Sequence, residues 1–253
     1  MSPRPNHGLA RPEKNVGHQE DGWVRRSSSH HWKTIGMQVT CVLTSCGRFE
    51  LLDRTLRSFF EFNTFPIKSF IIIDDSGYIN AAITIKEMID KIKIHEPPKF
   101  TVIANEHNIG QTKSIDWAYF HVETDYIFHI EDDWEFYAPG FIEESALIMQ
   151  SNPWIITVWL RAHNDTNGHP IEKLKDLEYP LMSLGYADWW HGFTWNPGLR
   201  RLKDYEMVDG EAAAGRHYMR KGFRAAISNK EDGYVKHIGW DNSTAHIEGT
   251  RKA

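Results

Sequence analysis

The sequence predicts an α/β fold, a single domain in which helices flank a mostly parallel sheet. Between residues 38 and 136, four short apolar runs rich in β-branched residues alternate with segments of helical period. This alternation is the pattern of a parallel sheet with crossover helices. A polar cluster follows each apolar run. Because such sheets bind ligands at the carboxyl ends of their strands, we expect the four clusters to meet at one edge.

The first strand is predicted at residues 39–44, where apolar and β-branched residues precede a polar loop. Leu52, Leu56, Phe59 and Phe60 repeat at i, i+4, i+7 and i+8, which predicts an amphipathic helix. Strands and helices then continue to alternate. The further strands are expected at 70–73, 100–103 and 126–130, and the further helices at 81–94 and 115–122.

The pattern becomes less regular after Pro139-Gly140. The predicted elements are a helix at 141–150, a strand at 154–159, a loop or lid at 161–183, a strand within the aromatic segment 186–197, and a helix at 211–222. No internal repeat and no second independent core is recognisable, so residues 37–253 are expected to form one domain. Residues 1–36 hold prolines, glycines and serines with hardly any aliphatic side chains, which predicts a disordered leader or an extension.

Composition narrows the classes of function. Apolar residues make up 41% and charged residues 25% of the 253-residue chain, as in a globular protein with a sizeable core. The formal net charge of −5 argues against a nucleic-acid partner. Cys41 and Cys46 provide neither a disulfide framework nor a zinc site. No apolar run approaches the ~20 residues of a transmembrane segment and no signal peptide is recognisable, so we expect a cytoplasmic protein and leave peripheral association with a membrane open.

Three adjacent acids, Glu131-Asp132-Asp133, end the fourth predicted strand. Adjacent carboxylates repel one another, and they suit a hard cation such as Mg²⁺ or Mn²⁺ that bridges them to nucleotide phosphates. From the triplet alone, the alternative is a solvated turn. The other polar clusters expected at the same edge favour the metal-binding interpretation.

Four motifs in order resemble the nucleotide-binding half of GT-A glycosyltransferases, and the large inverting family 2 in particular. They are Thr44-Ser45-Cys46-Gly47-Arg48, Ile73-Asp74-Asp75-Ser76, Asn108-Ile109-Gly110 and Ile130-Glu131-Asp132-Asp133. The resemblance spans residues 38–136 and continues more faintly to about residue 250. It implies a Rossmann-like GT-A fold, with a nucleotide-binding half at 37–136 and an acceptor-binding half at 137–253.

The resemblance also implies an activity, the metal-dependent, inverting transfer of a sugar from a nucleoside-diphosphate sugar to a hydroxyl of a glycan, glycolipid or glycoprotein. It assigns Asp133 to the metal, Mn²⁺ or Mg²⁺, and places Glu131 or Asp132 at the ribose or at a metal-bound water. The remaining donor contacts that it implies are Thr44, Ser45, Arg48, Asp74 or Asp75, Asn108, Gly110 and Lys113. A plain turn is the alternative for Asp74-Asp75-Ser76-Gly77, and an exposed surface position is the alternative for Lys113.

Family members place a catalytic carboxylate at the start of a late helix, where it removes the proton of the attacking hydroxyl. Gly210-Glu211, followed by basic and aromatic residues, resembles that segment and makes Glu211 the general base. Glu206, Asp209 and Asp188 are rivals. A carboxylate that only stabilises the helix N-terminus is the alternative for Glu211.

The family often lines its acceptor pocket at the position of the aromatic segment. By this resemblance the acceptor contacts are Trp189, Trp190, His191 and Trp195. Indole faces pack well on the apolar faces of sugars, and core packing is the alternative for each tryptophan. His246 resembles a late histidine that completes metal coordination in some GT-A enzymes, with a structural histidine as the alternative.

Two other functions are compatible with the same architecture. A sugar-nucleotide pyrophosphorylase would carry a glycine-rich basic loop after the first strand, and Thr44-Ser45-Cys46-Gly47-Arg48 is a poor version of it. A non-catalytic sugar-binding module would keep the fold without the chemistry. Substitution of Glu211 separates these classes, because an enzyme would lose turnover and keep donor binding, whereas a binding module would lose little.

Overall fold

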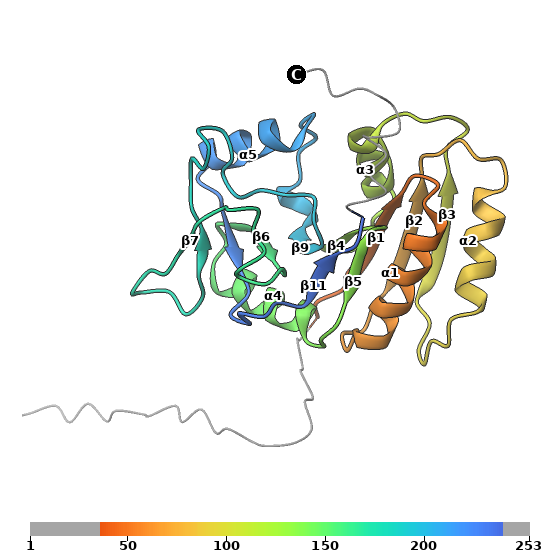
Figure 1. Ribbon diagram of the computed structural model, residues 1–253, viewed down its shortest axis with the longest axis horizontal. Coiled ribbons are helices and arrows are strands. Elements are labelled where there is room, and N and C mark those ends of the chain that lie inside the picture. The colour runs from red at the N-terminus through yellow and green to blue at the C-terminus, as the bar shows by residue number, and fades with distance from the viewer. Residues whose placement is uncertain (1–35, 240–253) are drawn as a thin grey trace, which may run out of the picture. The chain divides into compact units, whose positions relative to one another are not determined.

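The computed structural model describes residues 36–239, which lie within one compact unit, Gly36–Ala253. Its centre is a five-stranded sheet with the order β3-β2-β1-β4-β9 (Figure 1). The strands are β1 (Val39–Ser45), β2 (Ser69–Asp74), β3 (Lys99–Ala104), β4 (Tyr126–Glu131) and β9 (Gly198–Arg201). The first four run parallel, and β9 pairs antiparallel with β4. The four expected parallel strands are therefore confirmed, and their carboxyl ends share one edge.

Helices cover both faces of this sheet because successive strand residues point to opposite sides. Cys41 and Leu43 pack in the cluster that contains the apolar stripe of α1 (Phe49–Phe62) and Ile85 of α2 (Ala81–Asp90). Val42 packs on the other side, in the cluster of α3 (Gln111–Phe120). The strands are consequently buried on both faces, which explains their continuous apolar runs.

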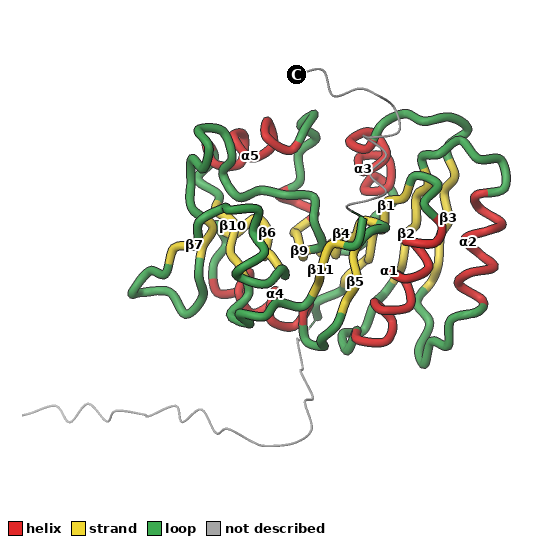
Figure 2. Tube along the Cα trace, viewed as in Figure 1, coloured by secondary structure: helices red, strands yellow, loops and turns green. Residues whose placement is uncertain are grey.

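The second half of the unit adds two smaller sheets (Figure 2). The elements are β5 (Trp134–Phe136), α4 (Phe141–Ser151), β6 (Ile155–Trp159), β7 (Ile171–Glu172), β8 (Leu181–Met182), the 3-10 turn η1 (Leu202–Asp204), α5 (Glu211–Arg220), β10 (Arg224–Ile227) and β11 (Val235–His237). One sheet has the order β6-β10-β8-β7, and the other pairs β5 with β11 antiparallel. The antiparallel pairing of β5 with β11 places His237 next to Asp133, the second residue after β4.

Two expectations about this half need correction. No strand forms within residues 186–197, where the backbone is left-handed at Ala187 and Asp188 and one isolated bridge joins Tyr186 to Trp190. The strand begins only after the proline, at Gly198. The segment 161–183 is not wholly irregular, since it contains β7 and β8.

The helix α2 stops at Asp90, four residues before the predicted end, and α3 starts at Gln111, four residues before the predicted start. Gly110 precedes α3 with φ 92°, a conformation that glycine adopts readily. The first turn of α3 is polar, so its sequence carries no apolar stripe that could mark the start.

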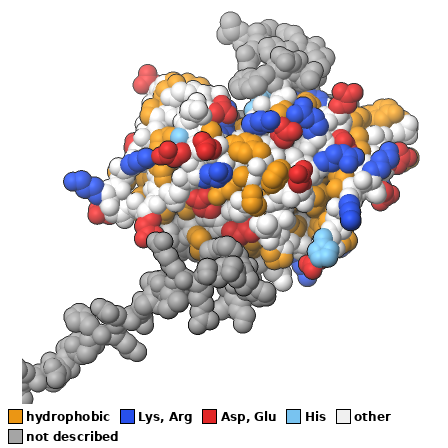
Figure 3. Space-filling model, turned by 60° about the horizontal axis from the view of Figure 1, so that its bottom comes forward, with side chains coloured by type: hydrophobic (Ala, Val, Ile, Leu, Met, Phe, Trp, Pro, Cys, Tyr) orange, Lys and Arg blue, Asp and Glu red, His pale blue; other side chains and the backbone are white. Residues whose placement is uncertain are grey.

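No helix within residues 36–239 is long and apolar enough to cross a membrane. The face of the molecule in Figure 3 mixes acidic, basic and hydrophobic side chains, and neither sign of charge dominates it. A continuous basic stripe of the kind that tracks a nucleic-acid backbone is not seen on this face.

Candidate active site

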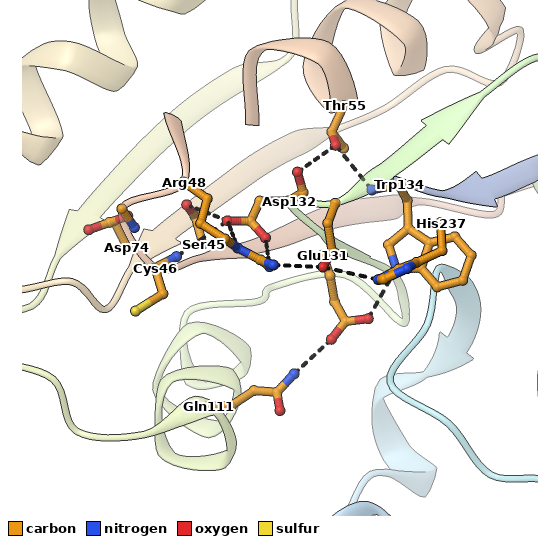
Figure 4. Close-up of polar contacts among 12 residues, drawn as sticks. Ser45, Cys46, Arg48, Thr55, Asp74, Gln111, Glu131, Asp132, Trp134 and His237 are labelled. Carbon is orange, nitrogen blue, oxygen red and sulfur yellow. Dashed lines mark hydrogen bonds and ion pairs between the residues drawn. The ribbon is translucent and has the colours of Figure 1, made fainter. Parts of the chain in front are cut away.

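The polar ends of β1, β2 and β4 are neighbours across the central sheet. The register pairs Ser45 with Asp74 and Thr44 with Glu131. Figure 4 shows Ser45, at the end of β1, and Arg48, in the loop after it, directed at Asp132, which follows β4. The expected convergence of the clusters at one edge is therefore present. The hydrogen bonds between the loops show which donors each carboxylate accepts.

Asp132 holds the loop that follows β1. Its side chain is buried and accepts hydrogen bonds from Ser45 Oγ at 3.0 Å, the Cys46 N–H at 3.4 Å and Arg48 Nε at 3.3 Å, and Arg48 Nη2 forms an ion pair with its other oxygen. Burial raises the pKa of Asp132 to about 6, although Arg48 and Ser45 act to lower it. Both oxygens of Asp132 are thus engaged within the protein (Figure 4).

The two acids at the end of β2 also hold loops. Asp74 accepts a hydrogen bond from the Gly47 N–H at 2.9 Å. Asp75 accepts hydrogen bonds from Asn105 Nδ2 at 2.7 Å, the Ile109 N–H at 2.9 Å and the Gly110 N–H at 2.8 Å. The structure therefore brings the predicted donor contacts together, and it gives Asp74 and Asp75 the role of bracing the loops on either side.

The remaining predicted donor residues line the same loops. Thr44 is buried at the end of β1, and Asn108 reaches across to Cys46 Sγ at 3.4 Å. Gly110 directly precedes α3, and Lys113 is exposed in the first turn of that helix. The exposure of Lys113 is compatible with either a phosphate contact or the surface position weighed above.

Glu131 is the last residue of β4 and is held by two side chains outside the loop that follows β1. Gln111 Nε2 donates a hydrogen bond to its Oε1 at 2.7 Å, and Trp134 Nε1 donates one to its Oε2 at 3.2 Å (Figure 4). Burial, followed by the charges of Asp133 and Glu211, raises the pKa of Glu131 to about 8. The Glu211 carboxylate, which is 80 residues away in sequence, therefore lies within electrostatic range of Glu131.

Asp133 and His237 are the described side chains that suit a divalent cation best. Asp133 Oδ2 lies 3.2 Å from His237 Nε2 and 2.9 Å from Arg48 Nη1. Burial opposes ionisation of Asp133, but the hydrogen bond of His237 and the charge of Arg48 outweigh it and lower the pKa of the carboxyl. In this structure the guanidinium of Arg48 supplies the positive charge beside both Asp132 and Asp133.

The spacing of Asp133 and His237 fits an octahedral ion. Two adjacent ligands with bonds of about 2.1 Å are about 3.0 Å apart, close to the 3.2 Å between Oδ2 and Nε2. Within residues 36–239 no group of three or more His, Cys, Asp or Glu side chains is arranged to hold a metal. Magnesium is usually held by one or two carboxylates together with substrate phosphates and water, so Asp133, with His237 beside it, could serve as the protein side of such a site.

Glu211 begins α5 directly after Gly210, and its charge acts on Glu131 at the end of β4. Its Oε1 accepts a hydrogen bond from the Trp195 N–H at 3.2 Å. Burial raises the pKa of Glu211, while the Thr194 hydroxyl, the Trp195 N–H and the charges of Arg200 and Arg161 lower it. A carboxylate with a raised pKa and fixed hydrogen bonds is well suited to accept a proton.

The rival bases lie elsewhere. Glu206 is exposed and forms ion pairs with His217 and Lys221. Asp209 and Asp188 are exposed in loops. Of the four candidates, Glu211 is the one that lies beside the acidic cluster.

The predicted acceptor residues divide into exposed and buried groups. Trp189 is 48% exposed and stacks on Trp190 with the ring planes 13° apart. His191 Nδ1 accepts a hydrogen bond from the Gly185 N–H at 3.0 Å. Trp195 is buried and packs under the guanidinium of Arg200. Trp195 therefore acts through its backbone N–H and its packing, and Trp189 is the side chain best placed to meet a large ligand.

Sequence reasoning missed His237 and Gln111, and it chose His246 instead, which lies outside the described residues. The signal for His237 was weak, because β11 has three residues and its partner strand lies about a hundred residues earlier. Gln111 carried a signal that could have been used, since it follows Gly110 at the start of a helix whose N-terminus points to the acids.

Residues 40–219 match the family described as glycosyl transferase family 2. None of the curated proteins matches the chain. Among solved structures, the mannosyltransferase PcManGT from Pyrobaculum calidifontis, in complex with GDP-Man and Mn²⁺, has a TM-score of 0.58 at 12% identity, over 78% of this chain and 56% of that one. S. aureus TarS 1–349 has a TM-score of 0.55 at 15% identity, over 80% and 61% of the two chains. TarS 1–349 in complex with UDP-GlcNAc gives 0.53 at 14% identity, over 81% and 61%. The chain thus spans less than two thirds of the length of these structures, and the likeness concerns the fold.

Proposed function

Because this chain belongs to glycosyl transferase family 2, we propose that it moves a sugar from a nucleoside-diphosphate sugar to a hydroxyl of a glycan, glycolipid or glycoprotein, with inversion at the anomeric carbon. The resemblance found in the sequence is confirmed by this membership. The complexes of PcManGT with GDP-Man and Mn²⁺ and of TarS with UDP-GlcNAc support a nucleotide-sugar donor and a divalent cation.

The observation that carries the proposal is that Glu211, at the start of α5, lies close enough for its charge to act on Glu131, the acid that ends β4. Glu211 comes from the second half of the fold and Glu131 and Asp133 from the first, yet the charges of Asp133 and Glu211 both raise the pKa of Glu131. Repulsion between buried carboxylates costs folding free energy, so their conjunction at a ligand-binding edge indicates chemistry rather than packing.

The donor is held by the loops at the carboxyl edge. Asp74, Asp75 and Asp132 fix these loops through hydrogen bonds from backbone N–H groups. The base and ribose then contact the loop residues themselves, with Thr44 and Asn108 among them. Lys113 reaches the phosphates from the first turn of α3, where the helix N-terminus also favours negative charge.

Asp133 and His237 are the residues that would hold Mn²⁺ or Mg²⁺. When bound there, the cation neutralises the charge that develops on the departing nucleoside diphosphate. Arg48 adds a fixed positive charge at the same place, through its ion pairs with Asp132 and Asp133.

Glu211 acts as the general base. The acceptor oxygen bonds to the anomeric carbon as the bond from that carbon to the diphosphate oxygen breaks, and the hydroxyl proton passes to the Glu211 carboxylate. The Trp195 N–H holds this carboxylate in place. Trp189, Trp190 and His191 contact the acceptor from the loop that precedes it, where Trp189 is exposed enough to receive a sugar face.

The proposal is tested by incubating the protein with a panel of UDP-, GDP- and dTDP-sugars, Mn²⁺ and a mixture of oligosaccharide acceptors, and by measuring release of the nucleoside diphosphate. We expect one donor to be consumed, and we expect the release to stop with Glu211→Gln. Release of pyrophosphate and a sugar phosphate would indicate the pyrophosphorylase instead. Tight donor binding without release from any member of the panel would indicate the non-catalytic module.

A further inference from the structure

Arg200 is a buried arginine that forms no ion pair with any of residues 36–239. It lies on β9 with 2% of its surface exposed. Its Nη1 donates a hydrogen bond to Tyr119 Oη at 2.8 Å, and its Nη2 donates one to the Thr194 carbonyl at 2.6 Å. Its Nε has no hydrogen-bond partner, and no carboxylate among residues 36–239 lies within ion-pair distance of its guanidinium.

The adjacent residue gives a direct contrast. Arg201 is also buried, but it forms an ion pair with Asp204 and donates hydrogen bonds to the carbonyls of Met149, Pro153 and Ile155. Neighbouring residues on a strand point to opposite faces of the sheet. The unpaired charge is thus confined to the face of β9 that looks toward α3 and the 194–196 turn. Burying a charge without a partner costs several kcal/mol unless other groups compensate it, so its compensation has to be sought on that face.

The contacts of Arg200 lead to the general base. Its Nη2 bonds the carbonyl of Thr194 and, at 3.4 Å, that of Asn196, and these two residues flank Trp195. The Trp195 N–H between them donates the hydrogen bond to Glu211 Oε1. The guanidinium carbon also lies 5.1 Å from the centre of the Trp195 ring and 5.5 Å from that of Phe193. One side chain therefore fixes both the peptide and the ring at the point where Glu211 is held.

We propose that Arg200 is a positioning residue for the reaction, which fixes the 194–196 turn against Glu211 through its hydrogen bonds to the carbonyls of Thr194 and Asn196 and places a buried positive charge beside that turn. This inference rests on the proposed function, in which Glu211 is the base. In this proposal the charge of Arg200 is compensated by the Glu211 carboxylate on the other side of the 194–196 turn, and not by a carboxylate in direct contact with the guanidinium.

The electrostatics of the site agree with this assignment. Among the described residues, Arg161 after β6 and Arg200 from β9 lie close enough for their charges to act on Glu211, and the charge of Glu211 acts in turn on Glu131 of β4. Burial raises the pKa of Glu211, and the two arginines lower it. Arg161 already forms an ion pair with Asp165, so its charge is partly compensated, whereas that of Arg200 is not. Removal of Arg200 should therefore raise the pKa of Glu211 and move the acid limb of the kcat profile to higher pH.

The test compares Arg200→Met, Arg200→Lys and the wild type by kcat from about pH 5 to about pH 9 and by the Kd of the nucleoside diphosphate. Arg200→Met should lose about fivefold more activity at about pH 6 than at about pH 8, because a base with a higher pKa is protonated over more of that range. Arg200→Lys keeps the positive charge but cannot donate to Tyr119 and Thr194 at the same time, as the guanidinium does. It should therefore lower kcat by the same factor at every pH. Arg201→Met is the matched control, expected to lower the unfolding midpoint and keep the wild-type shape of the profile.

The outcomes separate this inference from the function on which it rests. If Glu211→Gln retains kcat, Glu211 is not the base and the proposed function fails first. If Glu211→Gln is inactive while both Arg200 variants lose activity evenly with pH, Arg200 is a structural residue and only the present inference fails. A nucleoside-diphosphate Kd that weakens tenfold or so in Arg200→Met would also overturn it, because Arg200 would then bind the donor. Should Arg200→Met not fold, an acid limb moved in Arg200→Lys would contradict the role of the charge.

Discussion

The carboxylates of the first half of the fold and the aromatic side chains of the second half are held in place in different ways. Asp75 lies at the end of a strand paired on both sides, and it accepts three hydrogen bonds from the neighbouring loop. Trp189 lies in a loop whose backbone is left-handed at Ala187 and Asp188, and about half of its surface is exposed. The region proposed to bind the donor is thus braced by its own hydrogen bonds, whereas the region proposed to bind the acceptor presents an exposed indole on a loop with two left-handed residues.

The difference indicates a division of labour. A nucleoside diphosphate is a common ligand of many enzymes, so a rigid set of loops can recognise it. An acceptor differs from enzyme to enzyme, so its contacts are better placed on a loop that can vary without disturbing the sheet. Glu211 joins the two halves, because it comes from the second and lies among the acids of the first.

The largest effect is expected at that junction. Glu211→Gln removes the base and keeps the shape of the side chain, so kcat should fall by about 10² to 10⁴. The Kd of the nucleoside diphosphate should change little, since the donor is held by the first half. Glu206→Gln, which alters an exposed carboxylate five residues earlier, is the control and should keep the wild-type kcat. Steady-state kinetics and calorimetry on the same preparations would check both statements, and a large loss of donor affinity in Glu211→Gln would show that the halves are not separable.

The next effect concerns the rigid half alone. Asp75→Ala leaves the Ile109 and Gly110 N–H groups and Asn105 Nδ2 without their acceptor, so it should lower the free energy of unfolding by about 3 kcal/mol. Urea denaturation followed by tryptophan fluorescence measures this change. Asp90→Ala, at the exposed end of α2, is the control and should leave the midpoint unchanged or slightly higher, because it removes an acid from a helix C-terminus. Equal urea midpoints for Asp75→Ala and Asp90→Ala would show that Asp75 does not stabilise the loop.

A smaller effect is expected in the adaptable half. Trp189→Ala should raise the KM for the acceptor by about fivefold to tenfold, the equivalent of a lost sugar–indole contact of about 1 kcal/mol. The KM for the donor and the unfolding midpoint should stay as in the wild type. Trp154→Ala removes another exposed indole, 57% exposed and packed near Phe223, and should leave both KM values unchanged. The same acceptor KM in both variants would argue that the loop does not contact the acceptor.

The smallest effect is a dependence of stability on pH. His129 of β4 is fully buried, and burial followed by the charge of Arg200 holds its pKa well below the usual range. The unfolded chain binds a proton at this position near pH 6.5 and the folded chain does not, so stability should fall as the pH is lowered below about 6.5, by at most about 1.4 kcal/mol per pH unit. His129→Asn should flatten that slope, and His107→Asn, at an exposed loop position, should not. A slope that is identical in all three proteins would show that His129 is not the group responsible.

Much of the fold could be predicted from the sequence, and the reason is local. The apolar runs of β1 to β4 are buried on both faces, so period and composition mark them directly. The α/β fold expected from them is confirmed, as is the GT-A fold that the resemblance of the motifs implied. The strand expected within 186–197 was wrong because aromatic residues there pack as a loop, and no local pattern distinguishes an aromatic loop from an aromatic strand.

The location of the candidate site could be predicted from the sequence, but the roles of its individual residues could be predicted less well. A carboxylate after a strand can receive a ligand or a backbone N–H, and sequence cannot separate the two. Asp74, Asp75 and Asp132 accept N–H groups from loops 27 to 86 residues away. His237 reaches Asp133 across 104 residues of sequence. Contacts over such separations depend on the finished fold, and they leave no trace in the spacing of motifs.

The central claim is that Asp133, beside His237, anchors a metal-bridged nucleoside diphosphate at the carboxyl edge of the sheet. Calorimetric titration of the protein with UDP, GDP and dTDP, with and without Mn²⁺, tests it most directly, with Asp133→Ala as the variant. The surface variant Glu135→Ala, two residues later and paired with Lys236, is the matched control. The account predicts micromolar binding of one nucleoside diphosphate that requires Mn²⁺, that survives in Glu135→Ala and that is weakened at least about a hundredfold in Asp133→Ala. Binding of equal strength with and without the metal, or unchanged in a folded Asp133→Ala, would contradict it.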